Sequence, residues 1–481
     1  MSIGDHLMTV HLVSMGCARN DVDSEELAAR MEAGGFQLVD DPAEAETIVV
    51  NTCGFIEQAK KDSVDTLLAA ADLKGNGTTT SVVAVGCMAE RYGRELAESL
   101  PEANAVLGFD DYDDIAGRLR TILDGGSIEA RVPRDRRALL PISPVDRPTV
   151  RAGVSVPGHG TAPDLQASVA PAAGPRATRR RLETGPSAPL KMASGCDRRC
   201  AFCAIPRFRG SYLSRPTTEI VEEARWLVDH GVKEVFLVSE NSSSYGKDLG
   251  DLRLLEKLLV NLDQVDGLEW IRVSYLQPAE LRPGLIDTML ATNKVVPYFD
   301  LSFQHASGPL LRRMRRFGDA ESFLNIIDSI RSRCPYAGFR SNFIIGFPGE
   351  TDADIAVLTD FLQRARLDAA GIFAYSDEEG TEGAKLDRHV DEDLIGARRE
   401  VLADLTDELV SQRAEDRIGT RGRVMVEEID EGVVGRAEHQ GPEVDGVVTL
   451  VDAPAVGVGD IVDVEFVGSD GVDLVARPAN A

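Results

Sequence analysis

Three short runs of apolar and β-branched residues, at 9–16, 47–52 and 81–86, lie near the start of the 481-residue chain. Each run has the length of one buried strand, and each is followed by a stretch in which apolar residues recur at helical spacing. Strands that alternate with helices in this way build a parallel sheet. The pattern therefore predicts an open parallel α/β sheet domain over about residues 8–125.

A second alternation of strands and helices begins near residue 190. Its helical stretches, such as 219–230 and 321–332, again carry apolar residues at helical spacing. Six such units predict a partial TIM-like (β/α)6 barrel over 186–416, closed by a charged helical stretch at about 391–416. The six candidate strands are 190–195, 233–239, 269–275, 298–304, 339–345 and 369–375.

The remaining two segments have their own patterns. Residues 419–481 form short alternating strands between Gly-rich turns, which predicts a small β-barrel similar to the oligonucleotide-binding fold. Residues 144–189 hold eight of the 23 prolines and keep no period, so a linker or insert is predicted over 144–185. The run Arg179-Arg180-Arg181 is interpreted as a solvated part of this linker, and contact with ribosomal RNA is the alternative.

Charge narrows the classes of function. The chain has a net charge of −27, and phosphate contacts require clustered Lys and Arg, so generic nucleic-acid binding is disfavoured. No apolar run approaches the roughly 20 residues that span a bilayer. No Lys or Arg precedes Arg19, so the basic region of a secretory signal is missing. The sequence predicts a cytoplasmic protein without membrane contact.

Seven cysteines, an odd number, argue against a disulfide framework. Cys17, Cys53 and Cys87 each follow one of the first three predicted strands. Ligands of open parallel sheets bind outside the carboxyl ends of the strands, so these three thiols are expected to meet at one edge. Buried core cysteines are the alternative interpretation.

The densest group of cysteines is Cys196-x-x-x-Cys200-x-x-Cys203. Thiolates are soft ligands that suit iron–sulfur clusters. Three closely spaced ligands hold three irons of a 4Fe–4S cube and leave the fourth open for a substrate. A zinc site with a distant fourth ligand and buried core thiols are the alternatives. The motif follows the first barrel strand, where the active site of a TIM-like barrel belongs.

With this motif the sequence resembles the radical S-adenosylmethionine (SAM) superfamily. The resemblance implies that Cys196, Cys200 and Cys203 are catalytic and that the open iron binds SAM, which is cleaved to a 5′-deoxyadenosyl radical. Segments 237–241, 314–316 and 343–349 resemble cofactor-binding segments of the same superfamily. The cofactor-binding residues implied by this resemblance are Ser239, Glu240, Asn241, Arg316, Ile344 and Gly346.

The N-terminal triad narrows the resemblance to the methylthiotransferases. Cys17, Cys53 and Cys87, with the segments VSMGCARNDVDSE and VNTCGFIEQAKKDSVDTLL, resemble the ligands of a second 4Fe–4S cluster in that family. The family also ends in a small β-barrel, the TRAM domain. The 144–189 insert departs from the compact linker that is typical of the family.

Two branches of this family differ in substrate. One modifies isopentenyladenosine in tRNA, and the other modifies the β-carbon of an aspartate on small ribosomal subunit protein twelve. CGFIEQAKKDSVDTLL after Cys53 and YSDEEGT at 375–381 are similar to the second branch. The terminal barrel has a net charge of −9, which suits a basic ribosomal protein and repels tRNA. For Glu378 and Glu379 an exposed, solvated loop is the alternative interpretation.

The resemblance implies a complete reaction. A radical would remove a hydrogen from the aspartate β-carbon, the auxiliary cluster would present sulfur, and a second SAM would supply the methyl group. The implied partners are the ribosomal protein, free or within its subunit, and reduced flavodoxin or a ferredoxin-type electron donor. The tRNA branch and a non-catalytic iron–sulfur sensing module stay open as alternatives. Cys334 and His305 are interpreted as structural.

Overall fold

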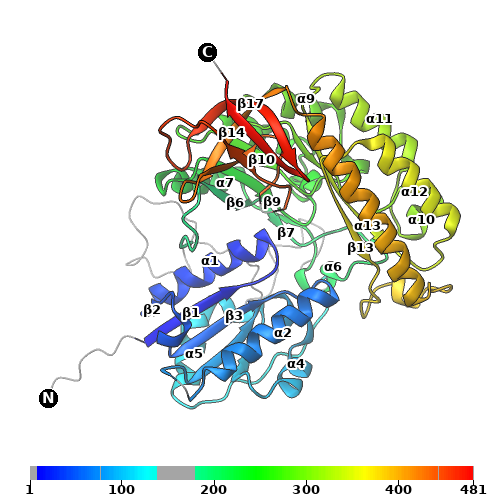
Figure 1. The fold of residues 1–481 in the computed structure, drawn as a ribbon. Helices are drawn as coiled ribbons and strands as arrows, with labels where there is room; N and C mark the ends of the chain where they lie inside the picture. Colours follow the sequence, from blue (N-terminus) through cyan, green and yellow to red (C-terminus); the bar gives the residue numbers. More distant parts are fainter. Residues whose placement is uncertain (1–7, 76, 138–178, 443, 480–481) are drawn as a thin grey trace. The chain divides into compact units, whose positions relative to one another are not determined.

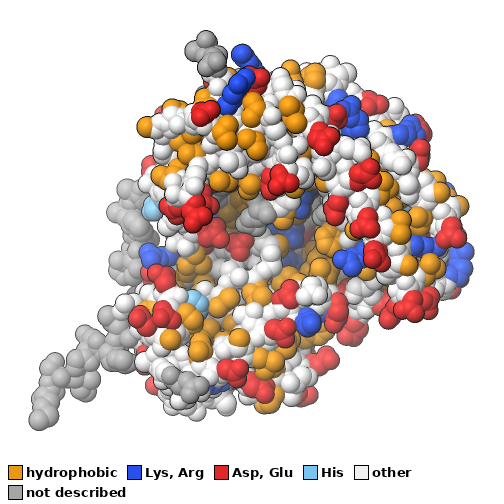
Figure 2. Space-filling model, in the orientation of Figure 1, with side chains coloured by type: hydrophobic (Ala, Val, Ile, Leu, Met, Phe, Trp, Pro, Cys, Tyr) orange, Lys and Arg blue, Asp and Glu red, His pale blue; other side chains and the backbone are white. Residues whose placement is uncertain are grey.

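The structure is a computed structural model that describes residues 8–75, 77–137, 179–442 and 444–479 (Figure 1). The predicted linker therefore lies largely outside the described residues, and the predicted domain boundaries stay predictions. Figure 2 shows acidic side chains spread over the visible face, among hydrophobic and basic ones. This distribution agrees with the net charge of −27.

The chain folds into two compact units. The first unit contains the described residues up to 183, together with 191–198 and 204–223. The second unit contains 184–190, 199–203 and 224–481. Cys196 of the CxxxCxxC segment thus belongs to the first unit, and Cys200 and Cys203 belong to the second.

The first unit is built on a five-stranded parallel sheet with the order β2-β1-β3-β4-β5. The three predicted strands are confirmed as β1, β3 and β4, and two very short strands at the sheet edges were not predicted. The strands are β1 (Met8–Ser14), β2 (Phe36–Leu38), β3 (Thr47–Thr52), β4 (Ser81–Val85) and β5 (Ala105–Val106).

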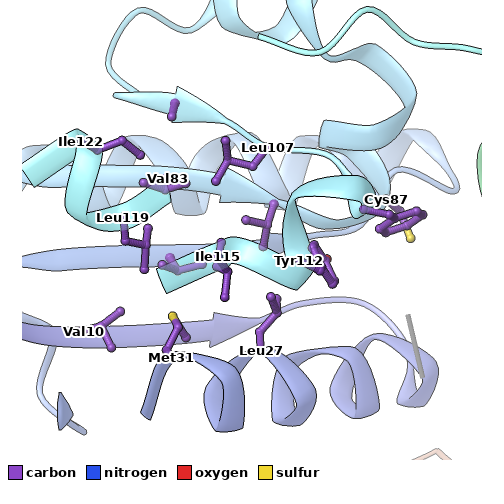
Figure 3. Close-up of a cluster of buried hydrophobic side chains, with 14 of the residues drawn as sticks. Val10, Leu27, Met31, Val83, Cys87, Leu107, Tyr112, Ile115, Leu119 and Ile122 are labelled. Carbon is purple, nitrogen blue, oxygen red and sulfur yellow. The ribbon is translucent and has the colours of Figure 1, made fainter. Parts of the chain in front are cut away.

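Helices cover both faces of this sheet because its strands are apolar on both sides. Val49 belongs to the same hydrophobic cluster as Leu27 of α1 and Leu119 of α5. Figure 3 labels these two leucines within the cluster. The next residue, Val50, packs on the opposite face with Leu67 of α2. The helices of this unit are α1 (Ala18–Ala33), α2 (Glu57–Asp72), α3 (Gly86–Tyr92), α4 (Arg94–Ser99), α5 (Ile115–Leu123) and α6 (Ile205–Arg209).

Two later segments complete the first unit. The short strands β7 (Ala193–Ser194) and β8 (Leu213–Ser214) pair in antiparallel fashion, and Phe208 of α6 joins the same hydrophobic cluster as Val49. Within this unit, the solvated-linker interpretation of Arg179 is wrong. Its side chain is buried and ion-paired with Glu25 and Glu223.

The second unit contains six barrel strands as two three-stranded sheets, β6-β9-β10 and β11-β12-β13. The first of these strands lies at 187–191, earlier than the predicted range 190–195. Parallel bridges from Ile271 to Val295 and from Leu276 to Leu301 continue the strand sequence between the sheets. The partial TIM-like barrel is therefore confirmed. Its strands are β6 (Ser187–Lys191), β9 (Glu234–Val238), β10 (Trp270–Val273), β11 (Tyr298–Asp300), β12 (Gly338–Ile345) and β13 (Ala369–Ala374).

Amphipathic helices alternate with these strands, as the periodicity predicts. The helix α12 begins with a capping box, in which Thr351 Oγ1 accepts from Asp354 N–H and Asp354 Oδ2 accepts from Thr351 N–H. The helices are α7 (Thr217–Asp229), α8 (Leu254–Asp263), α9 (Pro283–Ala291), α10 (Gly308–Arg313), α11 (Ala320–Arg331), α12 (Asp352–Ala365) and α13 (Glu392–Glu415).

The last strands close into a small barrel with the order β14-β15-β16-β18-β17, which confirms the predicted C-terminal β-barrel. Its Met425 packs with Trp270 and Tyr298, the first residues of β10 and β11. The small barrel therefore lies at the N-terminal ends of the core strands. Its strands are β14 (Arg421–Glu428), β15 (Val433–Ala437), β16 (Val448–Leu450), β17 (Ile461–Asp470) and β18 (Asp473–Pro478).

Across the residues that the structure describes, none of the helices combines the length and the apolar character required to cross a membrane.

Candidate functional site

The three N-terminal cysteines follow three neighbouring parallel strands of the first unit. Ser14 on β1 is aligned with Asn51 on β3, which is aligned in turn with the last residue of β4. Cys17, Cys53 and Cys87 come two or three positions after these aligned residues. Because parallel strands end at the same edge of a sheet, the topology brings all three cysteines to that edge.

Each of these cysteines has a defined local position. Cys17 is the residue before α1, and Cys87 is the second residue of α3, at the end of the cluster in Figure 3. Cys53 is buried after β3, where its N–H donates to Ser63 Oγ at 3.0 Å. Ser63 lies on α2, so a helix on one face of the sheet fixes the backbone at Cys53.

Glycines allow the cysteine-bearing turns to approach one another closely. Gly16 has φ +101°, and a Cβ there would lie 2.8 Å from Cys53 Sγ. Gly86 has φ +91°, and a Cβ there would lie 2.6 Å from the carbonyl oxygen of Thr52. Both positions need glycine for the left-handed backbone and for the lack of a side chain.

Two buried asparagines join the same turns. Asn20 Nδ2 donates to the carbonyl oxygens of Met15, at 2.7 Å, and Asn51, at 3.1 Å. Asn51 Nδ2 donates in return to the carbonyl oxygen of Asn20 at 3.0 Å and to Ser24 Oγ at 2.8 Å. These bonds hold the start of α1 against the end of β3, and so fix Cys17 relative to Cys53.

Burial and neighbouring charges shift the pKa values of the three thiols in different directions. Burial acts to raise the pKa of Cys17, but Arg19 and Arg209 together lower it. Burial raises the pKa of Cys87 to about 12, against a smaller opposing effect of Arg209. Burial also raises the pKa of Cys53, and the charge of Cys17 adds to the increase. Three thiols that affect one another share one electrostatic neighbourhood.

This donor set fits an iron–sulfur cluster. Metal ligation needs thiolates, and a bound cationic centre offsets the cost that burial imposes on Cys53 and Cys87. Among the described residues, no three His, Cys, Asp or Glu side chains converge where one ion could sit. A 4Fe–4S cube takes each cysteine on a different iron, so its ligands need not converge on one point.

In the first unit, the start of the second cysteine motif is fixed by backbone contacts. The N–H of Cys196 donates to the carbonyl oxygen of Gly210 at 3.1 Å. The N–H of Arg198 donates to Cys196 Sγ at 3.4 Å, and Asp197 Oδ1 accepts from the N–H of Tyr212 at 2.9 Å. Cys196 is half-buried, and these contacts hold the backbone around it.

The second unit contains the other two cysteines of the motif, and one of them, Cys200, lies beside Arg316. The N–H of Cys203 donates to the carbonyl oxygen of Cys200 at 3.1 Å. Arg316 places Nη1 3.7 Å from Cys200 Sγ and also donates to the carbonyl oxygen of Ser302. Both cysteines are half-buried. The guanidinium thus lies next to a predicted cluster ligand.

The end of β9 carries three predicted cofactor-binding residues. Ser239 and Asn241 are buried, and Ser239 Oγ accepts from the N–H of Asn241 at 3.2 Å. Asn241 Nδ2 donates to Ser244 Oγ at 2.8 Å and to Glu280 Oε2 at 2.9 Å. Asn241 Oδ1 is buried and accepts no hydrogen bond from the residues described. An oxygen in that state fits a ligand that brings a donor, such as the amino group of SAM.

The end of β12 carries two further predicted cofactor-binding residues, Ile344 and Gly346. Ile344 is half-buried, and its N–H donates to the carbonyl oxygen of Gln304 at 2.8 Å. Gly346 is buried with φ +87°, and its N–H donates to Glu350 Oε2 at 2.8 Å. A Cβ at Gly346 would overlap the side chain of Ile395 on α13. Gly346 therefore lets α13 pack against the strand end.

Two other predictions can be compared with the structure. His305 is buried with Nδ1 accepting from the N–H of Ser307 at 3.0 Å, and burial lowers its pKa to about 4. These contacts agree with a structural role, which stays a prediction. Glu378 is buried and accepts from Ser376 Oγ at 2.9 Å, so the alternative of a solvated loop is wrong for this residue. Glu379 is exposed.

The buried polar residues around the N-terminal triad were not predicted from the sequence. Asn20 is one of them, and Arg209, which donates to Cys87 Sγ at 3.1 Å, is another. A signal existed for Arg209, because a basic residue shortly after Cys203 is a candidate neighbour of thiolates. Nothing in the local sequence indicates Asn20, which lies on α1 and bonds to Asn51 at the end of β3.

Three families match successive parts of the chain. Residues 9–108 match the uncharacterized protein family UPF0004, residues 190–362 match the radical SAM superfamily, and residues 418–478 match the TRAM domain. Together with the partial barrel and the closed terminal barrel, these matches define the class. The chain is a radical SAM protein with a TRAM domain.

Relatives of similar length narrow the class. The chain is 92% identical to "Ribosomal protein uS12 methylthiotransferase RimO" of Cutibacterium acnes, over 100% of both chains. It is 62% identical to the protein of the same name from Streptomyces coelicolor, over 98% of this chain and 96% of that one. The chain belongs to the family of ribosomal protein uS12 methylthiotransferases, the RimO family.

A solved structure supports the fold. The radical S-adenosylmethionine methyltransferase TsrM from Kitasatospora setae matches with a TM-score of 0.53 and 15% identity, over 88% of this chain and 79% of that one. At this level of identity the likeness concerns the fold alone.

Proposed function

We propose that this chain is an enzyme that methylthiolates the β-carbon of an aspartate on small ribosomal subunit protein twelve (uS12). The observation that carries the proposal is the 92% identity, over the full length, to a relative named for that activity. The cysteine-bearing edge of the first unit and the strand ends of the second unit supply residues that suit the reaction. The C–H bond at that carbon is neither acidic nor electrophilic. Acid–base groups alone therefore cannot activate it, and a radical is needed.

The proposed cofactors are two 4Fe–4S clusters and SAM. Cys17, Cys53 and Cys87 would hold the auxiliary cluster; the ligands of the other are Cys196, Cys200 and Cys203. When bound, these groups supply the chemistry that the polypeptide lacks, which is a carbon-centred radical, a sulfur atom and a methyl group. The chain positions the thiols through parallel strand ends, glycine turns and the asparagine bonds.

The proposed SAM site lies at the carboxyl ends of the core strands, as TIM-like barrels favour. Asn241 and Ser239 are proposed to accept from the amino group, together with the adjacent Glu240, and Asn241 Oδ1, which has no partner among the described residues, supports this. Arg316, whose guanidinium lies beside Cys200, is proposed to attract the carboxylate. Ile344 offers an apolar surface to the adenine, and Gly346 shapes the strand end. The adjacent cysteines and this polar set support one shared site for cluster and cofactor.

The proposed protein partner is uS12, free or within the small subunit. The −9 charge of residues 419–481 suits a basic protein and opposes tRNA. Reduced flavodoxin or a ferredoxin-type protein is the proposed electron donor, and the proposed location is the cytoplasm, where ribosomes are found.

The test is tryptic mass spectrometry of uS12 after anaerobic incubation with the reconstituted full chain, SAM, a sulfide source and a reductant. We expect one aspartate-containing peptide in which a methylthio group replaces one hydrogen. The Cys17→Ala, Cys53→Ala, Cys87→Ala variant should give no such peptide. Cys334→Ala is the matched control and should retain activity, because this thiol lies in neither triad. Modification of tRNA adenosine instead of uS12 would favour the other branch.

A further inference from the structure

A buried arginine touches one of the N-terminal cysteines in the first unit. Arg209 is the last residue of α6 and is 5% exposed. Its Nη2 donates to Cys87 Sγ at 3.1 Å and to Asp23 Oδ2 at 3.0 Å. The same nitrogen lies 3.4 Å from Asn20 Oδ1. The guanidinium therefore joins a thiol to the polar residues that fix the start of α1.

The arginine is held in this position from several directions. Asp23, fully buried on α1, also forms an ion pair with buried Lys191. The guanidinium carbon of Arg209 lies 5.3 Å from the ring centre of Phe109, a cation–π geometry. Phe208, the preceding residue, packs in the hydrophobic core of this unit. A side chain fixed by an ion pair, a ring and its own helix has little freedom to leave the sulfur.

Stability alone does not account for this arrangement. Burying a guanidinium has a desolvation penalty of several kcal/mol, which its partners only partly offset. Replacing buried ion pairs with apolar residues is often neutral or stabilising. A charge-assisted N–H bond to sulfur has another effect, because it withdraws electron density from the ligand. Hydrogen bonds and charges at the ligating sulfurs are known determinants of the reduction potential of iron–sulfur clusters.

The position in the chain adds a second observation. Arg209 lies six residues after Cys203, so one short segment contains the end of the second cysteine motif and the arginine that contacts Cys87. Arg19 offers a contrast. It lies two residues from Cys17, its Nη2 is 3.5 Å from that sulfur, and it is half-buried. The contact to Cys87 is closer, and it comes from a segment 122 positions away.

We propose that Arg209 is a positioning residue for the auxiliary metal centre. It fixes Cys87 Sγ and, through its positive charge, raises the reduction potential of the cluster ligated there. In the low dielectric of the buried edge, a cation stabilises the reduced cluster, which carries one more negative charge. The inference rests on the proposed function only in that Cys17, Cys53 and Cys87 hold a cluster.

The test uses the full chain with Cys196→Ala, Cys200→Ala and Cys203→Ala, in which only the auxiliary cluster can form. Arg209→Gln and Arg209→Lys are made in this parent and reconstituted anaerobically. Iron content, EPR spectra and midpoint potential are measured, and circular dichroism checks the fold. Arg179→Gln is the matched control, because Arg179 is a buried, ion-paired arginine of the same unit.

We expect Arg209→Gln to shift the midpoint potential to a more negative value and to alter the EPR spectrum. Arg209→Lys keeps the charge and should recover part of the shift. Selective loss of iron from a folded Arg209→Gln protein, recovered by Lys, also supports the proposal, because it shows that Cys87 needs the contact. An unchanged potential and spectrum with full iron overturn it, as does an equal shift or iron loss in Arg179→Gln. A parent that binds no iron instead contradicts the assignment of the triad.

Discussion

Glu234 on β9 accepts a hydrogen bond from Arg272 on the neighbouring strand β10, with 2.7 Å between Nε and Oε1. Both side chains are fully buried, and Arg436 of the terminal barrel pairs with the same carboxylate. Arg436 also reaches Glu427 at 2.9 Å. One buried carboxylate thus joins the radical SAM core to the TRAM domain within the second unit.

We expect Glu234→Gln to destabilise the second unit strongly. The substitution leaves Arg272 and Arg436 buried without their shared counter-charge, a loss that typically costs about 3–5 kcal/mol. Glu465→Gln is the matched control, because its partner Arg477 is more than half exposed and such pairs are worth about 0.2–1 kcal/mol. Denaturation of the full chains, compared side by side, measures both effects. Equal losses for the two variants would contradict the role of burial.

Glu234 also predicts a dependence of stability on pH. Burial acts to raise the pKa of this carboxyl, but Arg272 and Arg436 outweigh it and lower the pKa from 4.5 to about 2. A lowered pKa contributes stability that is fully present above about pH 4.5 and is lost as the pH falls toward 2. The shift corresponds to about 3 kcal/mol. Melting temperatures between pH 6 and pH 2.5 should therefore fall less steeply for Glu234→Gln than for the parent.

The regular elements could be predicted from the sequence because their patterns are local. The strands β1, β3 and β4 are continuous apolar runs, and the core strands alternate with helices of clear period. The edge strands β2 and β5, with three and two residues, are too short to carry a period. Their pairing is decided by the neighbouring strand and not by their own residues.

The candidate site could be predicted only in part, because only some of its features depend on local sequence patterns. Cysteines directly after parallel strands of one sheet are expected at the same edge, so the meeting of Cys17, Cys53 and Cys87 there could be predicted. Their role as cluster ligands stays a prediction. The contacts that tune them are long-range, as in Arg209 on Cys87. The burial of Arg179 was missed for this reason too, since its carboxylate partners lie on other elements.

Gly86 is predicted to be essential for the auxiliary centre. Alanine there would hold an unfavourable positive φ and would crowd the carbonyl oxygen of Thr52, at a cost of roughly 2–4 kcal/mol. We expect Gly86→Ala to lose iron from the N-terminal triad. Gly125→Ala separates the two effects, because Gly125 has φ +80° with no atom within 4 Å of an added Cβ. The Gly125→Ala substitution should lower the free energy of unfolding by about 1 kcal/mol, and the variant should retain its iron. If both variants kept all their iron, the close packing at Gly86 would not matter to the cluster.

Iron content should divide between the two triads. Reconstitution of the full chain is expected to give about eight irons, four for each cube. Replacing Cys196, Cys200 and Cys203 with alanine should leave about four and abolish SAM cleavage. Replacing the three N-terminal cysteines should also leave about four, with SAM cleavage retained. Full iron content in the second variant would contradict a two-cluster protein.

The acidic residues of the TRAM domain are not equivalent. Glu427 is held by the buried guanidinium of Arg436, so it is not available for docking. Glu428, Asp430 and Glu431 are exposed, at the turn between β14 and β15. This domain packs on the N-terminal ends of the core strands, whereas Ser239 and its neighbours follow the carboxyl ends. Charges on the turn are therefore expected to affect docking of a protein partner and not the chemistry.

We expect reversal of Glu428, Asp430 and Glu431 to Lys to slow the capture of uS12 by about tenfold at low salt. At about 0.15 M salt the Debye length is about 8 Å, so the difference should shrink as salt rises. SAM cleavage without substrate should be unchanged. Binding rates at two salt concentrations, measured anaerobically, provide the comparison.

The control for this reversal changes the same amount of charge elsewhere in the second unit. Asp404, Asp407 and Glu408 are exposed on α13, and their reversal to Lys alters the net charge equally. If the acidic turn is the docking surface, this control should slow capture much less. Equal slowing by both variants would show that uS12 responds to overall charge and not to the turn. Capture and methylthiolation of tRNA by the unaltered chain, with uS12 ignored, would contradict the proposed substrate itself.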